Sequence, residues 1–136
     1  MNNPIVKRKD ILYPELSYVI FGCAFEVFNQ LGPGHAEKTY HRALAIAFQE
    51  KGIPFKEQVY YPVKFKDKIV GKNVFDFLVN EKIIVELKKN VRYSKVHLEQ
   101  VLNYLKVSDF KLALLVNFTN EGVTSKRIIN ISEQTQ

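Results

Sequence analysis

Two acidic residues and a lysine interrupt a β-strand pattern whose other positions are mostly apolar. Asp76 lies between Val74 and Leu78, and Glu86 and Lys88 follow in the next β-rich run. Because side chains alternate between the two faces of a strand, Asp76 should share a face with Val74 and Leu78, and Glu86 should share a face with Lys88. A carboxylate among apolar neighbours is costly unless it is paired or binds a cation. This constellation therefore needs a chemical explanation.

A hard-cation site is one explanation. Mg²⁺ prefers oxygen ligands and is commonly held by one or two carboxylates together with water and substrate phosphate. Asp76 and Glu86 would supply the carboxylates for Mg²⁺ or Mn²⁺. Lys88 would orient or help to deprotonate an attacking water and offset negative charge in the transition state. The structural alternative is that Lys88 pairs with Glu86 or Asp76 at a sheet edge, without a metal.

Two amphipathic helices precede these strands. Apolar residues at three- and four-residue steps predict a first helix over 15–31, which Gly32-Pro33-Gly34 would end. A second apolar stripe predicts a helix from about residue 36 to residue 48, closed by Lys51-Gly52.

The period then changes to two, which predicts strands. We expect a strand over 59–65, a charged turn at 66–68 that leads into Ile69-Val70, and further strands over 74–79 and 82–87 that form an antiparallel meander. Ser94 is a plausible N-cap of a third helix with Leu98, Val101, Leu102 and Leu105 as its buried stripe. Strands over 111–118 and 126–131 would follow. The order ααβββαββ predicts an α/β fold with a mixed sheet flanked by helices.

Length and composition predict a single domain over 15–131, with a loose basic N-terminus over 1–14 and a polar tail over 132–136. The apolar run 18–25 is too short to span a bilayer and is followed by Glu26, so we expect no membrane insertion. The single cysteine, Cys23, lies in this apolar stretch and is expected in the core, in keeping with a reducing cytoplasmic setting. The formal charge of +6 favours an anionic partner such as nucleic acid, although it also fits a solvated basic surface.

Several ordered blocks resemble a known family. Residues 34–40, Gly-His-Ala-Glu-Lys-Thr-Tyr, fit the G-x-x-E-x-x-Y signature of the GxxExxY proteins. Further blocks that resemble this family are 52–55, 75–79, 85–88, 100–105, 115–118 and 126–129. The resemblance covers roughly residues 17–131, which is nearly the entire predicted domain.

The GxxExxY family is grouped with the PD-(D/E)xK nuclease superfamily, so the resemblance implies a restriction-endonuclease-like fold. It assigns the family's Asp, acidic residue and Lys to Asp76, Glu86 and Lys88, and it implies Glu37 as a further metal ligand. Gln100 matches a glutamine that the wider superfamily uses on the helix after the E-x-K strand. Two positions depart from the pattern. Phe75 replaces the proline of "PD", and Phe28 stands where many members have a histidine, which puts a substrate contact in doubt.

Other polar residues are candidate substrate contacts, each with a structural alternative. Tyr40 is either such a contact or a core aromatic whose hydroxyl reaches one partner. His97, Gln100 and Tyr104 form a polar stripe on the third predicted helix. The stripe is either a set of substrate contacts or an ordinary half-exposed helix face. Lys89 and Arg92 are phosphate contacts or solvated charges, and Glu37 also suits the positive end of a helix dipole. His35 and His41 show no ligand spacing and receive no role.

Two functions follow from these residues. The first is a Mg²⁺-dependent nuclease that hydrolyses phosphodiester bonds of DNA or RNA, for which a homodimer would provide two sites for a double-strand cut. The alternative is a non-catalytic nucleic-acid-binding or protein-interaction module that retains the fold, because a fold alone does not establish chemistry.

Overall fold

Two helices open the described part of the chain, which comprises residues 13–90 and 95–130 of a computed structural model. Helix α2 (Pro14–Leu31) begins at a proline, whose missing N–H is harmless in a first turn. It ends at Gly32, which adopts a φ of 75° and donates its N–H to the Phe28 carbonyl at 2.7 Å. Helix α3 (Glu37–Glu50) follows after a short loop. Both predicted helices are confirmed, and neither they nor any other helix within residues 13–90 and 95–130 is long and apolar enough to cross a membrane.

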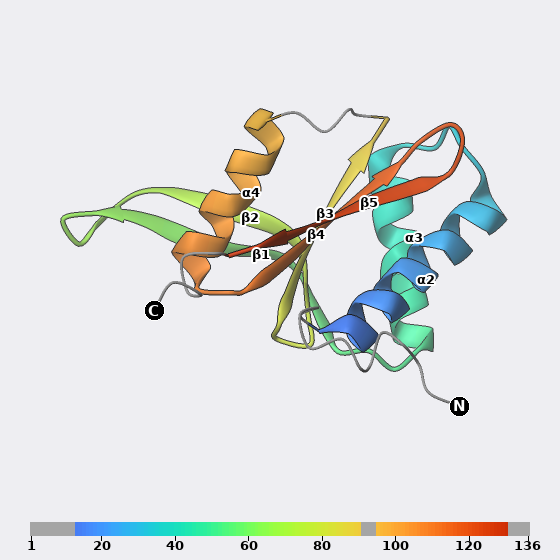
Figure 1. Cartoon of the computed structure of the whole chain (residues 1–136), viewed down its shortest axis with the longest axis horizontal. Helices are drawn as coiled ribbons and strands as arrows, with labels where there is room; N and C mark the ends of the chain where they lie inside the picture. The colour runs from blue at the N-terminus through green and yellow to red at the C-terminus, as the bar shows by residue number, and fades with distance from the viewer. Residues whose placement is uncertain (1–12, 91–94, 131–136) are drawn as a thin grey trace.

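Five strands form one mixed sheet in the order β1-β2-β3-β4-β5 (Figure 1). Strands β3 and β4 are parallel, and the other neighbouring pairs are antiparallel. Helix α4 (Lys95–Ser108) connects the parallel pair, as a crossover must. The predicted order ααβββαββ and the α/β class are confirmed. The strands are β1 (Phe55–Phe65), β2 (Lys68–Val79), β3 (Ile83–Lys89), β4 (Leu112–Phe118) and β5 (Val123–Ile129).

Three strands begin earlier than the sequence prediction places them. Strand β1 begins at Phe55 instead of residue 59, and β2 is one continuous 12-residue strand instead of two short apolar runs. Strand β5 begins at Val123, because the polar Thr124 and Ser125 pair with Asn117 and Val116 of β4. In each case the strand includes polar residues that pair through their backbone, although the side-chain pattern alone predicts a loop for them.

The predicted termini cannot be compared in full, because residues 1–12 and 131–136 lie outside the described residues. The predicted N-cap Ser94 also lies outside them. Helix α4 begins at the next residue, and its predicted stripe packs on the sheet with Val101 and Leu105 buried.

The sheet separates two apolar clusters. Helices α2 and α3 cover one face, where alternate β4 residues such as Leu114 and Val116 pack, and Cys23 is fully buried there as expected. Helix α4 covers part of the other face and packs on the intervening residues Ala113 and Leu115. Figure 1 shows the helix pair and α4 on opposite sides of the twisted sheet. Every residue of β4 is buried, as predicted for a strand covered on both faces.

Candidate active site

Where β2 and β3 separate, two carboxylate side chains accept backbone N–H bonds in place of the carbonyls of the neighbouring strand. The regular pairing of these strands ends at Phe77 opposite Val85. One step further, the Asp76 N–H donates to Glu86 Oε1 at 2.8 Å, and the Leu87 N–H donates to Asp76 Oδ2 at 2.7 Å. The two acids therefore lie side by side in the gap between the strands, and each satisfies a backbone donor of the other strand.

The side-chain alternation of β2 breaks at Asp76. Phe75 packs in the cluster under α4, whereas Phe77 packs in the cluster under α2 and α3, although residues two apart share a face in a regular strand. Gln58, the residue of β1 across from Asp76, has a φ of 50°. The prediction that Val74 and Leu78 share the face of Asp76 is therefore wrong. Leu78 lies with Phe75 in the α4 cluster, so Val74 must point to the other face.

Glu86 is a buried acid with too little positive charge around it. Its side chain follows Ile84 on the α4 face of β3, and the residue is only 7% exposed. Burial, followed by repulsion from Asp76, raises the pKa of Glu86 to about 8, although Lys88 acts in the opposite direction. A carboxyl in this environment is stabilised by any added cation.

Lys88, on the same strand as Glu86, and Glu37, on α3, lie near the carboxylate pair. Burial and the charge of Asp76 raise the pKa of Glu37, and Lys88 and His41 lower it. Lys88 thus lies within electrostatic reach of both Glu37 and Glu86. Glu37 is the first residue of α3, where the helix dipole also favours a negative charge. Four of the five predicted catalytic residues, Asp76, Glu86, Lys88 and Glu37, therefore lie within electrostatic reach of one another.

His41 is a member of this neighbourhood that the sequence analysis missed. Its Nε2 lies 2.8 Å from Glu57 Oε1, its Nδ1 lies 3.9 Å from Asp76 Oδ1, and its ring stacks on Phe77 with centroids 4.2 Å apart. The signal available in the sequence was spacing, because His41 is four residues after Glu37 and so lies on the same helix face.

A cleft of about 360 Å³ opens beside Asp76. Glu37 and His41 line it from α3, and Glu57 and Gln58 line it from β1. Lys38 and Arg42 also border it. This mixture of acidic and basic groups suits a phosphate ester together with a cation.

The remaining predicted residues divide between core and surface. Tyr40 is 1% exposed, stacks on Phe118, and donates its hydroxyl to the Gly32 carbonyl at 2.7 Å, which matches its structural alternative. Tyr104 of α4 is buried against Phe75, and its pKa is raised by burial and then by Glu86 and Asp76.

The last four candidates are Gln100, His97, Lys89 and Arg92. Gln100 is exposed on α4, and His97 and Lys89 are half-buried. Arg92 lies outside the described residues.

A divalent cation fits the carboxylate pair, although the acids do not form a complete cage. Within residues 13–90 and 95–130, no three His, Cys, Asp or Glu side chains are grouped closely enough to hold a metal ion. Asp76 and Glu86 each use one oxygen for a backbone N–H, which leaves Asp76 Oδ1 and Glu86 Oε2 for a cation. Mg²⁺ commonly takes one or two carboxylates and completes its shell with water and phosphate. Burial and the neighbouring Asp76 raise the pKa of Glu86, and a cation at the pair would act against both effects.

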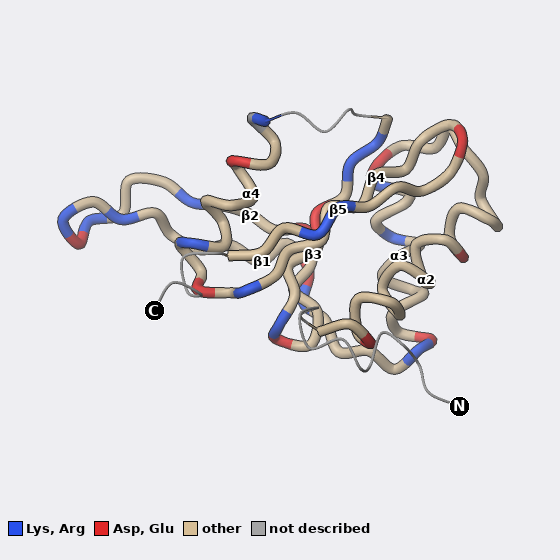
Figure 2. The backbone as a smooth tube through the Cα atoms, viewed as in Figure 1, with Lys and Arg blue, Asp and Glu red and all other residues tan. Residues whose placement is uncertain are grey.

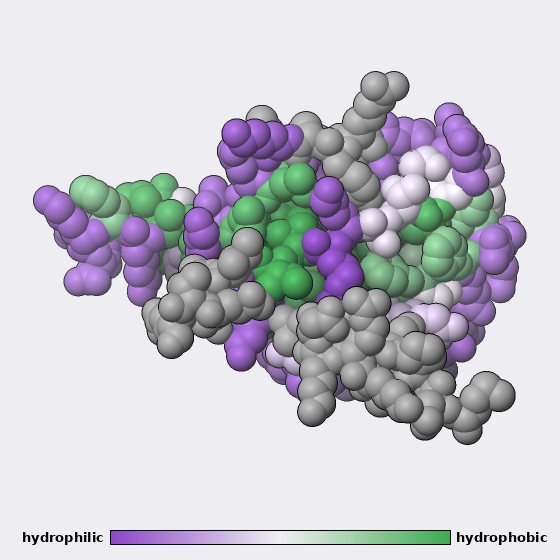
Figure 3. Space-filling view, in the orientation of Figure 1, coloured by the Kyte–Doolittle hydropathy of each residue, from purple (hydrophilic) through white to green (hydrophobic). Residues whose placement is uncertain are grey.

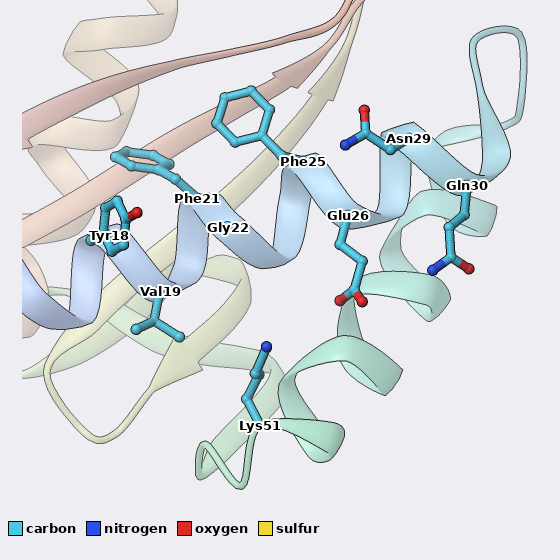
Figure 4. A pocket seen from close by; sticks show the side chains of 9 residues that line it. All are labelled: Tyr18, Val19, Phe21, Gly22, Phe25, Glu26, Asn29, Gln30 and Lys51. Atoms are coloured by element: carbon cyan, nitrogen blue, oxygen red, sulfur yellow. The ribbon is translucent and has the colours of Figure 1, made fainter.

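A larger concavity of about 740 Å³ lies elsewhere, along α2. Figure 4 shows the aromatic rings of Tyr18, Phe21 and Phe25 following one another along this helix, with Glu26 and Lys51 on another side. None of the predicted site residues lines this groove. Its size therefore says nothing about the chemistry of the acidic pair.

Comparison with known proteins identifies a family over nearly the whole described chain. The family model described as "PD-(D/E)XK nuclease superfamily" matches residues 14–129. No curated protein has a sequence that matches this chain significantly.

Three solved structures resemble the fold. The crystal structure of SSO0001 has a TM-score of 0.54 and 17% identity, and the alignment covers 68% of this chain. This chain spans 48% of that protein's length. An alkaline exonuclease (LHK-Exo) from Laribacter hongkongensis has a TM-score of 0.52 and 14% identity over 96% of this chain and 75% of its own. The same enzyme in complex with dAMP has a TM-score of 0.52 and 12% identity, with the same coverage of both chains. At these identities the likeness shows the restriction-endonuclease-like fold alone.

Proposed function

The chain belongs to the PD-(D/E)XK nuclease superfamily, and we propose that it is a metal-dependent nuclease that hydrolyses phosphodiester bonds of DNA or RNA with Asp76, Glu86 and Lys88 at its centre. One observation carries the proposal. Two carboxylates lie side by side between separated strands, and the more buried one has its pKa raised to about 8. A buried acid pair of this kind is unfavourable alone and favourable beside a cation.

Asp76 and Glu86 would hold Mg²⁺ or Mn²⁺ through Asp76 Oδ1 and Glu86 Oε2. The cation would supply positive charge beside the scissile phosphate and raise the acidity of water. Lys88 would hold the attacking water and counter the charge that builds on the phosphate oxygens. The backbone N–H bonds to Asp76 Oδ2 and Glu86 Oε1 fix both carboxylates, so little reorganisation is needed on binding.

The finer assignment is membership of the GxxExxY group, with Glu37 as a third acidic ligand. Its support is the G-x-x-E-x-x-Y sequence at 34–40 and the electrostatic coupling of Glu37 to Asp76 and Lys88. Gln100 would position water or phosphate from α4. We also propose a cytoplasmic location and a homodimer that provides two sites.

The test is a cleavage assay with matched variants. Single- and double-stranded DNA and RNA are incubated with Mg²⁺, Mn²⁺ or chelator. We expect cleavage only with metal, and a loss of at least ~100-fold in Glu86→Gln and Lys88→Met, since electrostatic groups at a reacting centre contribute on this order. Glu99→Gln and Lys106→Met are the controls. They make the same chemical changes at exposed positions of α4 and should retain activity.

The non-catalytic alternative has one observation in its favour, namely that Asp76 and Glu86 also join the two strands. It predicts binding without cleavage under every metal condition. Equal cleavage by wild type and Lys88→Met would likewise contradict the assignment of Lys88.

A further inference from the structure

The β1–β2 hairpin extends beyond the sheet as a two-stranded ribbon. Strand β2 pairs with β3 only through residues 77–79, so no third strand within residues 13–90 and 95–130 pairs with residues 59–75. We call this segment the arm, and Figure 1 shows it projecting from the body of the protein. At its base, Tyr61 packs on Phe75 and Phe110.

The arm carries a large share of the positive charge of the chain. It contains Lys64, Lys66, Lys68 and Lys72 and one acid, Asp67, which gives a formal charge of +3 in 17 residues. The whole chain has a formal charge of +6, so half of it lies in one-eighth of the length. Figure 2 shows the blue lysine segments gathered on the arm.

Exposed rings alternate with these lysines. Tyr60 and Phe65 are each 62% exposed. The Lys72 ammonium lies 5.1 Å from the Tyr60 ring centroid, and the Lys66 ammonium lies 5.4 Å from that of Phe65. Figure 3 shows hydrophilic and hydrophobic residues interleaved along the arm. Aromatic rings for bases and cations for phosphates are the two components of single-strand binding surfaces.

One face of the arm leads to the cleft. Tyr61 and Phe75 turn toward the α4 cluster, so by alternation Tyr60 and its partner Val74 point to the opposite face. Lys72 lies on that face over the Tyr60 ring. The next residues of the same two strands, Gln58 and Asp76, line the cleft. A strand laid across Tyr60 would therefore continue directly toward the acidic pair.

We propose that the arm is a binding surface for single-stranded nucleic acid, with Tyr60 stacking on a base and Lys66 and Lys72 contacting phosphates, which delivers the strand to the cleft. The delivery step rests on the proposed nuclease function. The binding step is independent of it, because it needs no metal.

The test measures binding in chelator, where no metal-dependent cleavage occurs. The full chain is titrated into fluorescently labelled single-stranded and duplex DNA of equal length, and anisotropy is recorded at several salt concentrations. Lys66→Gln/Lys72→Gln should weaken single-strand binding by ~10-fold or more and reduce the slope of log K against log[salt] by ~1.4, since each phosphate contact contributes about 0.7 for single strands. Lys106→Gln/Lys111→Gln is the matched control, because it removes the same charge from exposed positions outside the arm.

Tyr60→Ala tests the stacking contact. It should weaken single-strand binding by ~5-fold or more, since stacking on one aromatic ring contributes about 1–3 kcal/mol, and it should weaken duplex binding much less. Thermal unfolding establishes that each variant folds, and sedimentation velocity measures its oligomeric state.

The outcomes separate the two proposals. If Lys66→Gln/Lys72→Gln and Lys106→Gln/Lys111→Gln weakened single-strand binding equally, the proposed binding surface would be overturned. It would also be overturned if Tyr60→Ala weakened duplex binding and single-strand binding to the same extent. A Tyr60→Ala change in oligomeric state with binding intact would make the arm a contact between copies of the chain and would also overturn it. Arm-dependent binding without cleavage in metal would sustain the surface and refute the nuclease.

Discussion

Glu86 is the residue whose surroundings differ most from those of an ordinary carboxyl. In the folded chain its pKa is raised from the ordinary value of 4.5 to about 8, first by burial and then by Asp76. Between these two pH values the unfolded chain releases the proton that the folded chain retains. The free energy of unfolding therefore falls as pH rises through this window, because the unfolded state binds fewer protons.

Glu86→Gln should remove this pH dependence while keeping an acceptor for the Asp76 N–H. In chelator, we expect the variant to be more stable than wild type at pH 8 by at least about 1 kcal/mol, since one unit of pKa corresponds to about 1.4 kcal/mol. The difference should vanish near pH 4, where both states are protonated. Urea unfolding at both pH values measures it, with Glu99→Gln as an exposed control. A variant that is equally destabilised at both pH values would contradict the assigned environment.

Tyr40 shows how a motif residue can be structural. Its hydroxyl bonds to the loop that precedes α3, the helix that carries Glu37 and His41. Tyr40→Phe should lower the free energy of unfolding by about 1 kcal/mol through the lost hydrogen bond. Denaturant unfolding measures this, and Tyr18→Phe, at a 64% exposed position, should change stability far less. Equal stability of Tyr40→Phe and wild type would show that the loop does not depend on this hydroxyl.

At the scale of elements, apolar periodicity predicted the order and type of every helix and strand. The acidic pair and Lys88 could be identified because they interrupt apolar strands. The break in alternation at Asp76 could not, because it belongs to the pairing of separate strands: Gln58, across from Asp76 in β1, also departs from strand geometry with a φ of 50°. His41 was missed for a related reason. Its partners, Glu57 and Asp76, lie on separate strands, and only the folded sheet brings them together.

Gln58 provides a prediction at this scale. A left-handed conformation costs a residue with a Cβ roughly 1–2 kcal/mol, and glycine avoids this cost. Gln58→Gly should therefore leave stability unchanged or raise it by up to about 1 kcal/mol. Lys64→Gly, in the same strand at a position without a positive φ, should lower stability by about 0.5–1 kcal/mol. Thermal unfolding of the two variants compares them directly, and equal losses would contradict the left-handed conformation of Gln58.

At the scale of the molecule, repulsion and burial make the acidic pair unfavourable, and a bound cation should relieve this cost. Millimolar Mg²⁺ or Mn²⁺ at pH 8 should raise the melting temperature of the wild type, since a ligand at ~100 times its dissociation constant contributes about 2.7 kcal/mol. Glu86→Gln should respond less, and K⁺ at equal ionic strength should not reproduce the rise. The same gain in wild type and Glu86→Gln would place the cation elsewhere.

The gap between β2 and β3 also affects how related sequences should be compared. Because Asp76 and Glu86 bind the backbone of each other's strand, selection for stability alone would retain oxygen-bearing side chains at both positions after activity was lost. An oxygen-bearing side chain at either position is thus, by itself, a poor marker of a working enzyme. Among the described residues, the Lys88 ammonium makes no hydrogen bond or ion pair, so replacement of Lys88 would be the more informative sign that a related protein has lost activity.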